Sequence, residues 1–193
     1  MITLSEHRIV ISPVGTVGSE LFEPISIRIK RIFGYKTEVI PSMQDISFAL
    51  DPQRRQYHST PILKKLEEAA PVQAIKIIGI TSVDLFIPIL THVYGEAQIG
   101  GAACIISTHR LAEGLSIAAD KDTYYKRVAK EAVHELGHTF KLRHCKDNAC
   151  IMHYCRSIKD VDRKSEQLCR YCKTLLEDEM KRIGDSSQLT VHS

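Results

Sequence analysis

The sequence has no apolar run long enough to cross a membrane and no N-terminal export signal. No stretch approaches the roughly 20 apolar residues that a spanning helix needs. The opening, MITLSEHRIVISPVG, also lacks a basic region followed by a long apolar one. We therefore expect a cytoplasmic protein without a membrane partner.

The chain also lacks a strong charge imbalance, an internal repeat and a low-complexity segment. Its formal net charge is +3, and acidic and basic residues are interspersed. The bases around the C-terminal cysteines could suggest a nucleic-acid-binding zinc module, but they alternate with acids as on a solvated helical face, so we expect no nucleic-acid partner. At 193 residues with 44% hydrophobic content, one soluble domain is expected, and a monomer is favoured.

Strand and helix patterns alternate over the first hundred residues. Short β-branched or apolar runs predict strands at residues 7–12, 37–40, 74–81 and 102–107. Apolar residues at helical spacing, with start signals at Ser19 and at Thr60 followed by Pro61, predict two helices between them. Two later helices are predicted at residues 123–140 and 161–183. This order favours an α/β sheet with helices on its faces.

Three histidines and a glutamate lie together in HELGHTFKLRHC, residues 134–145. On a helix, His134 and His138 share one face and can bind one tetrahedral zinc, with Glu135 beside them. His144 is about 600° of helical rotation beyond His138, so the chain must turn sharply to bring it back. Three imidazoles leave one position for water, as in a catalytic zinc site. A structural or fortuitous cluster is the alternative.

In a chain without an export signal, six cysteines favour thiol chemistry or metal binding over disulfides. Cys104 stands alone in an apolar run. The others all follow the histidine cluster: Cys145, Cys150, Cys155, Cys169 and Cys172.

This pattern resembles that of the archaemetzincins, a family within the metzincin clan of zinc peptidases. HExxH continues to a third histidine followed directly by a cysteine, and then through Cys150 and Met152 to the pair Cys169 and Cys172. The spacer before that pair is one residue shorter than is usual in the family. Upstream, RIVISPVG and YGEAQIGGAACIISTHRL are compatible with the family along most of the chain.

The resemblance implies a zinc-dependent peptidase acting on peptides or proteins. His134, His138 and His144 would hold the catalytic zinc. Glu135 would be the general base and acid, taking a proton from a zinc-bound water as the water attacks the peptide carbonyl and then giving it to the leaving amine.

A second, structural zinc is also implied, so that two zincs per chain are expected. Its ligands would be four thiolates: Cys145, Cys150, Cys169 and Cys172. Four thiolates leave no position for water, which makes such a site closed. Disulfides or free core thiols are alternatives, and Cys155 could replace one of the four ligands.

Met152 would be the methionine of the turn beside the catalytic zinc, packing without binding the metal. Simple core packing is the alternative. Tyr154 could bind the zinc reversibly, or donate a hydrogen bond to the tetrahedral intermediate. It could equally be a tyrosine that only packs near the site. His153 is expected to face solvent.

The fold implied is α/β, a metzincin-like mixed twisted sheet with an active-site helix and a C-terminal helical subdomain stabilised by the structural zinc. One domain is expected over residues 1–183, with an α/β part at 1–140 and a C-terminal part at 141–183. Residues 184–193 are expected to form a flexible tail.

Substrate binding is assigned to an edge strand near GGAACIIS, where an extended peptide could pair through main-chain hydrogen bonds. Alternatively, Gly100 and Gly101 form only a turn before a buried strand.

Lys141 departs from the family pattern, which has glycine there because the backbone at the end of the helix takes a positive φ. A lysine can adopt this conformation at a cost of about 1 kcal/mol. We therefore expect the fold and the zinc to persist, and Lys141→Gly to raise stability modestly. The ammonium group could still interact with a substrate carboxylate or obstruct the open zinc position. A catalytically weak or inactive zinc protein that binds peptides or partners is therefore the alternative function.

Overall fold

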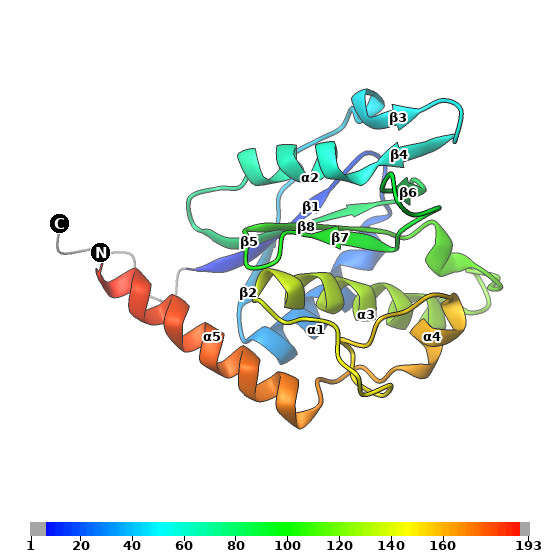
Figure 1. Cartoon of the computed structure of the whole chain (residues 1–193). Helices are drawn as coiled ribbons and strands as arrows, with labels where there is room; N and C mark the ends of the chain where they lie inside the picture. The colour runs from blue at the N-terminus through cyan, green and yellow to red at the C-terminus, as the bar shows by residue number, and fades with distance from the viewer. Residues whose placement is uncertain (1–6, 190–193) are drawn as a thin grey trace.

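The computed structural model describes residues 7–189 and shows a mixed α/β architecture (Figure 1). The strands are β1 (Arg8–Pro13), β2 (Lys36–Val39), β3 (Leu50–Asp51), β4 (Gln56–His58), β5 (Ala74–Thr81), β6 (Leu85–Phe86), β7 (Gly95–Ala97) and β8 (Ala103–Ser107). The helices are α1 (Phe22–Phe33), α2 (Ser59–Glu68), α3 (Lys121–Thr139), α4 (Ile158–Arg163) and α5 (Arg170–Leu189).

The main sheet has the strand order β2-β1-β5-β8-β7 within the described residues. The first four strands are parallel, and β7 runs antiparallel to β8. A second, small sheet of order β3-β4-β6 lies beside it. The antiparallel β7 therefore forms one edge of an otherwise parallel sheet.

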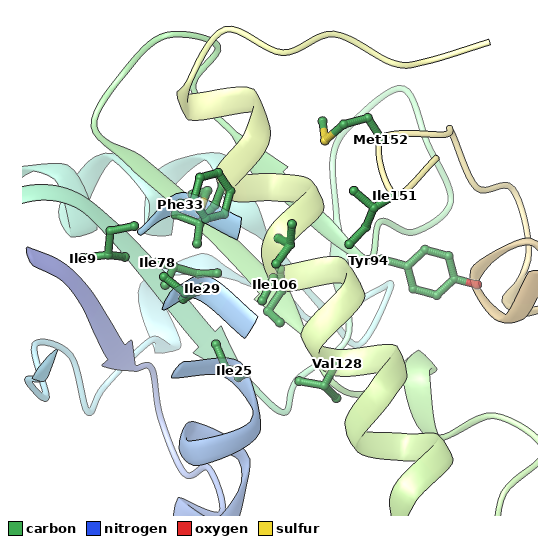
Figure 2. Close-up of a cluster of buried hydrophobic side chains, with 14 of the residues drawn as sticks. Ile9, Ile25, Ile29, Phe33, Ile78, Tyr94, Ile106, Val128, Ile151 and Met152 are labelled. Carbon is green, nitrogen blue, oxygen red and sulfur yellow. The ribbon is translucent and has the colours of Figure 1, made fainter. Parts of the chain in front are cut away.

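Two hydrophobic clusters occupy the two faces of the main sheet. Because successive side chains of a strand point to opposite faces, Ile9 and Ile78 join one cluster while Val10 and Ile77 join the other. The first cluster lies under α1 and α3 (Figure 2), and the second under α2. The central strands are buried on both faces, as expected for a sheet covered by helices.

Most of the predicted elements are confirmed. The four predicted strands correspond to β1, β2, β5 and β8, and the first three predicted helices correspond to α1, α2 and α3. The mixed α/β class with an active-site helix is confirmed as well. The short strands β3, β4, β6 and β7 were not predicted.

The last predicted helix, residues 161–183, is wrong as a single element. The chain leaves the helical conformation at Lys164, whose ψ is 147°, because residues 165 and 167 instead bond to the backbone of residues 149 and 151. The second helix, α5, continues past the predicted end to Leu189. Residues 184–189 of the expected tail are thus helical, and 190–193 lie outside the described residues.

Among the described residues, no helix is both long and apolar enough to cross a membrane.

Candidate metal and catalytic site

The helix α3 carries the histidine motif in its buried C-terminal half. His134, Glu135 and His138 are each less than 9% exposed. The helix packs against β8 and β7 of the sheet on one side and against α4 on another. These contacts hold the three side chains on elements that are themselves packed.

After α3 the chain reverses through a Schellman turn. The N–H of Leu142 donates to the carbonyl of Gly137, and the N–H of Lys141 donates to that of His138, both at 3.0 Å. Lys141 has a φ of +62°, the left-handed conformation that this motif requires. The predicted sharp turn and the positive φ at residue 141 are both confirmed. The turn brings His144 back to the other two histidines.

The three imidazoles converge on one point. One ring nitrogen from each of His134, His138 and His144 lies within 4.8 Å of the others. The Nδ1–H of His134 donates to the carbonyl of Ile151 at 2.9 Å, and that of His138 to the carbonyl of Leu142 at 2.7 Å. These bonds select the tautomer in which Nε2 carries the lone pair. The two Nε2 atoms lie 3.2 Å apart.

The charge state of this cluster fits a metal ion. Burial lowers the pKa of all three imidazoles, that of His144 to about 4. They are therefore neutral near pH 7, which is the form that binds zinc. Three neutral imidazoles whose tautomers are held by backbone carbonyls suit a zinc ion with an open coordination position.

Met152 is fully buried, and its sulfur packs directly against α3 at Gly137. A Cβ built on Gly137 would lie 2.5 Å from the sulfur of Met152. The glycine therefore permits the close approach, although it costs about 1 kcal/mol relative to alanine inside a helix. Sequence reasoning named Met152 but missed Gly137, for which an internal helical glycine was the available signal.

A cleft of about 690 Å³ runs between β7 and the chain that follows α3, with the histidines on its floor. Gly95 of β7 lies against Glu135, since a Cβ on Gly95 would be 2.6 Å from Glu135 Cγ. Burial raises the pKa of the Glu135 carboxyl, and the carboxylates of Glu131 and Glu96 raise it further, against the opposing effect of the Lys164 ammonium. Glu135 is thus held between α3 and the edge strand. Gly95 was not predicted from the sequence.

The edge strand expected near GGAACIIS is not formed by these residues themselves. β8 pairs with β5 on one side and with β7 on the other, and all its residues are buried. Gly100, with a φ of +72°, and Gly101 belong to the turn before it. The alternative reading of the two glycines as a turn is therefore correct. The free edge lies along β7, which lines the cleft.

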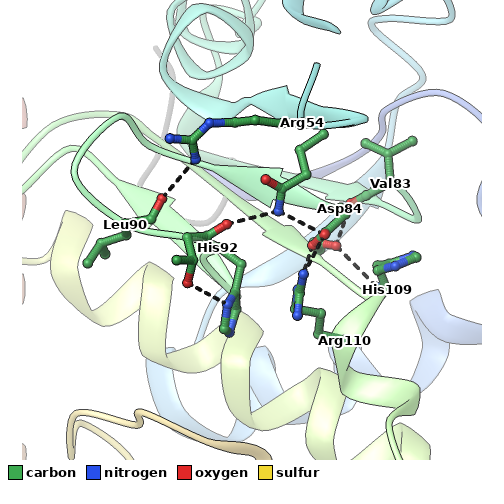
Figure 3. Close-up of polar contacts among 10 residues, drawn as sticks. Arg54, Val83, Asp84, Leu90, His92, His109 and Arg110 are labelled. Atoms are coloured by element: carbon green, nitrogen blue, oxygen red, sulfur yellow. Dashed lines mark hydrogen bonds and ion pairs between the residues drawn. The ribbon is translucent and has the colours of Figure 1, made fainter. Parts of the chain in front are cut away.

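A polar network holds the loop at residues 87–93, which forms the rim of the cleft beyond β7 (Figure 3). Asp84 accepts two hydrogen bonds of 2.7 Å from Arg110 and one of 2.9 Å from Gln56. The same Gln56 amide donates to the carbonyl of Thr91 at 2.9 Å. The rim is thus tied to the body of the fold at its base.

Tyr154 lies beside the histidine cluster, with its ring centroid 4.9 Å from that of His144. It is 43% exposed and lines the cleft. His153 was expected to face solvent, but the structure does not place it fully in solvent. It is half-buried, and its Nδ1–H donates to the carbonyl of Cys145 at 3.0 Å.

Four cysteine sulfurs form a second convergent cluster, and all lie within 4.8 Å of one another: Cys145, Cys150, Cys169 and Cys172. All are free thiols. The backbone N–H of Cys169 donates to the sulfur of Cys150 at 3.3 Å, and that of Cys172 to the sulfur of Cys169 at 3.5 Å. Backbone donors of this kind favour thiolates. Four sulfurs at these separations suit a closed tetrahedral zinc site.

The remaining cysteines lie elsewhere. Cys155 is outside the four-sulfur cluster and lines the cleft, and burial raises the pKa of its thiol to about 11. Cys104 is buried within β8. The structure therefore brings together the four cysteines of the predicted set without Cys155.

A buried ion pair lies behind His134. Lys164 has a fully buried side chain, and its Nζ is 2.7 Å from Oε1 of Glu131. The same Nζ is 3.5 Å from Nδ1 of His134. Sequence reasoning missed both residues. The position of Glu131 on the same face of α3 as His134 was a usable signal, whereas no local pattern pointed to Lys164.

Lys141 points away from the cleft. Its Nζ lies 2.7 Å from Glu179 on α5, and its aliphatic chain packs over Gly100. It is not among the residues that line the cleft. The expectation that this ammonium could obstruct the open zinc position is therefore wrong.

The fold and the HExxH helix beneath an edge strand define the class of this molecule: it is a zinc metallopeptidase. The sequence model of Peptidase family M54 matches residues 28–178. The chain therefore belongs to peptidase family M54, the family of the archaemetzincins.

Known archaemetzincins are similar to this protein in sequence and structure along nearly the whole chain. An archaemetzincin of Archaeoglobus fulgidus is 38% identical over 86% of this chain and 96% of its own length. One of Methanocaldococcus jannaschii is 36% identical over 89% and 93%. The crystal structure of the Methanopyrus kandleri archaemetzincin superposes with a TM-score of 0.82 at 30% identity, covering 94% of this chain and 99% of that one. The A. fulgidus structure, which is complexed with malonate, gives 0.75 at 37% identity, covering 87% and 99%.

Proposed function

We propose that His134, His138 and His144 hold one catalytic zinc and that Glu135 is the general base and acid of peptide-bond hydrolysis. The observation that carries the proposal is the convergence of three ring nitrogens within 4.8 Å beside a glutamate that lies against the edge strand. When bound, zinc would supply a Lewis acid that polarises the substrate carbonyl and acidifies water.

The side chains of the cleft perform the remaining steps. An extended peptide pairs with the free edge of β7 through main-chain hydrogen bonds, which places its backbone above the histidines. Glu135 accepts the proton of the attacking water and delivers it to the nitrogen of the leaving amine. Tyr154, which packs on the ring of His144, donates a hydrogen bond to the carbonyl oxygen as negative charge develops there.

We further propose that the four cysteines hold a second, structural zinc. This ion would link the loop that begins at Cys145, directly after His144, to α5 through Cys169 and Cys172. A closed four-thiolate site contributes folding free energy but no position for substrate. Its role is therefore to hold the His144 loop in place.

The test compares the wild type with Glu135→Gln, both loaded with zinc, against a broad peptide library analysed by mass spectrometry. We expect equal zinc contents, cleavage by the wild type, and a loss of roughly 10²- to 10⁴-fold in rate for the variant because a general base is removed. Equal cleavage by both proteins would refute the role of Glu135. Peptide binding without cleavage by the zinc-loaded wild type would instead favour the alternative function, a catalytically weak zinc protein.

A further inference from the structure

The lower rim of the cleft, residues 143–144 and 154–156, carries two exposed arginines. Arg143 directly precedes His144, and Arg156 follows Tyr154 by two residues. Both line the cleft and both are exposed. Within residues 7–189, neither guanidinium group makes a hydrogen bond or an ion pair. Each is therefore available to a ligand.

The carboxylates that line the cleft are, in contrast, already engaged. Glu96 accepts hydrogen bonds from the hydroxyls of Ser59 and Thr60, at the first turn of α2. Glu131 is paired with the buried Lys164 at 2.7 Å. These two groups therefore do not compensate the arginines, and the third carboxylate, Glu135, is the buried catalytic group of the proposed mechanism.

The two arginines belong to segments that contact α3 at different points along the helix. Arg143 follows the C-terminal end of α3, where the N–H of Gly100 donates to the carbonyl of His138. Arg156 lies two residues before α4, whose Val161 carbonyl accepts a hydrogen bond from Lys130 at the middle of α3, four residues before His134. Along α3, His134 lies between these two points of contact. Figure 1 shows the segment that runs from the end of α3 to α4.

The opposite rim has a different character. It offers the backbone of β7 together with exposed apolar side chains, including Ile99 and Leu90. Extended peptides alternate their side chains between two directions. A peptide paired with β7 would therefore direct alternate side chains toward the floor of the cleft and away from it. Its unpaired edge would face the rim that carries the two arginines, whose long side chains can reach carboxylates on either set.

We propose that Arg143 and Arg156 are specificity-determining residues that select peptides with acidic side chains on both sides of the scissile bond. This inference rests on the proposed function, because it places the substrate along β7. A guanidinium group is the preferred partner for a carboxylate, which it binds with two parallel N–H donors. The preferred substrate is thus an extended, acidic peptide segment with a neutral centre.

The test measures the binding of fluorescent ten-residue peptides to the zinc-loaded Glu135→Ala protein. This variant is used because it should cleave the peptides too slowly to disturb the binding equilibrium. Three peptides share a neutral centre and carry glutamate, glutamine or lysine on both sides. We expect the glutamate peptide to bind about tenfold more tightly than the glutamine peptide at low salt, given about three- to fivefold for each exposed pair. This preference should shrink in about 1 M salt, where the Debye length is about 3 Å.

Charge-reversal variants then show which arginine contacts which side of the bound peptide. Arg143→Glu and Arg156→Glu should each reduce the preference for glutamate about threefold or more. Two further peptides carry glutamates on only one side of the neutral centre. Each variant should bind one of these two peptides more weakly than the wild type does, and the two variants should differ in which peptide is affected. Arg163→Glu is the matched control, because this arginine is 70% exposed and pairs with Asp160 outside the cleft. It should leave the preference unchanged.

Equal binding of the glutamate and glutamine peptides would overturn the inference, as would an equal effect of Arg163→Glu. Parallel cleavage by the wild type separates this outcome from failure of the proposed function. Cleavage by the wild type without a preference for glutamate peptides would contradict only the role proposed for the arginines. Tight, arginine-dependent binding of the glutamate peptide without any cleavage by the wild type would contradict only the proposed peptidase mechanism.

Discussion

At position 141 the backbone takes the conformation that the family motif assigns to glycine, but the side chain adds a contact that glycine cannot make. The left-handed φ costs a lysine about 1 kcal/mol. The ion pair with Glu179 offsets part of this cost, although the Lys141 side chain is 57% exposed and the pair is accordingly weakened by solvent. Lys141 therefore links the end of the active-site helix to α5 without entering the cleft.

We expect Lys141→Gly to leave the free energy of unfolding within about 1 kcal/mol of the wild type, because relief of the strained φ and loss of the ion pair oppose each other. This replaces the expectation of a modest gain. Lys141→Ala keeps the strain and loses the pair, so it should be the less stable of the two by about 1 kcal/mol. Chemical denaturation of the three proteins measures both differences. A glycine variant less stable than the alanine variant would contradict this explanation.

The predictability of individual residues depended on whether their partners were close in sequence. The roles proposed for His134, Glu135 and His138 follow from helical spacing alone, and His144 from the need for a turn. Lys164 could not be found, because its partner Glu131 is far away in the sequence and no local pattern marks a buried ammonium. Gly95 could not be found either, since its significance depends on contact with Glu135.

At the scale of elements, α4 is attached to α3 by charged groups rather than by apolar packing alone. Arg127 makes two hydrogen bonds of 2.7 Å to Asp162, and Lys130 donates to the carbonyl of Val161 at 2.9 Å. Glu131, one residue further along α3, pairs with Lys164. These contacts explain why α3 is buried on the side that carries its basic residues.

Removing one partner of the buried pair should be costly. We expect Lys164→Met to lower the free energy of unfolding by about 3–5 kcal/mol, because it leaves the Glu131 carboxylate buried and unpaired. The double variant Glu131→Gln with Lys164→Met removes both charges and should recover most of this loss. Denaturant unfolding of the two singles and the double completes the cycle. A double variant as unstable as Lys164→Met would show that the pair is not the source of the effect.

The elements themselves were predictable where the sequence pattern was strong. β1, β5 and β8 are buried apolar runs, and α1 and α2 have one apolar face each. The strand β7 comprises only Gly95–Ala97, too short for a periodic signal, and it is defined by its pairing with β8. The break between α4 and α5 is likewise tertiary, since residues 165 and 167 bond to the loop at 149–151.

At the scale of the whole molecule, two convergent clusters of metal-binding side chains share one loop. His144 belongs to the histidine cluster and Cys145 to the cysteine cluster, and they are consecutive in the chain. The loop thus joins the active-site helix to α5 through both clusters. Metal binding at the cysteines is therefore expected to hold in place a ligand of the other site.

The most direct test of this account is the zinc content of the wild type and of His138→Ala, measured by native mass spectrometry on folded protein. His138→Ala removes a central nitrogen of one cluster and touches none of the four sulfurs. We predict two zincs per chain in the wild type and one in the variant. A wild type that holds only one zinc, or a folded His138→Ala that still holds two, would contradict the account.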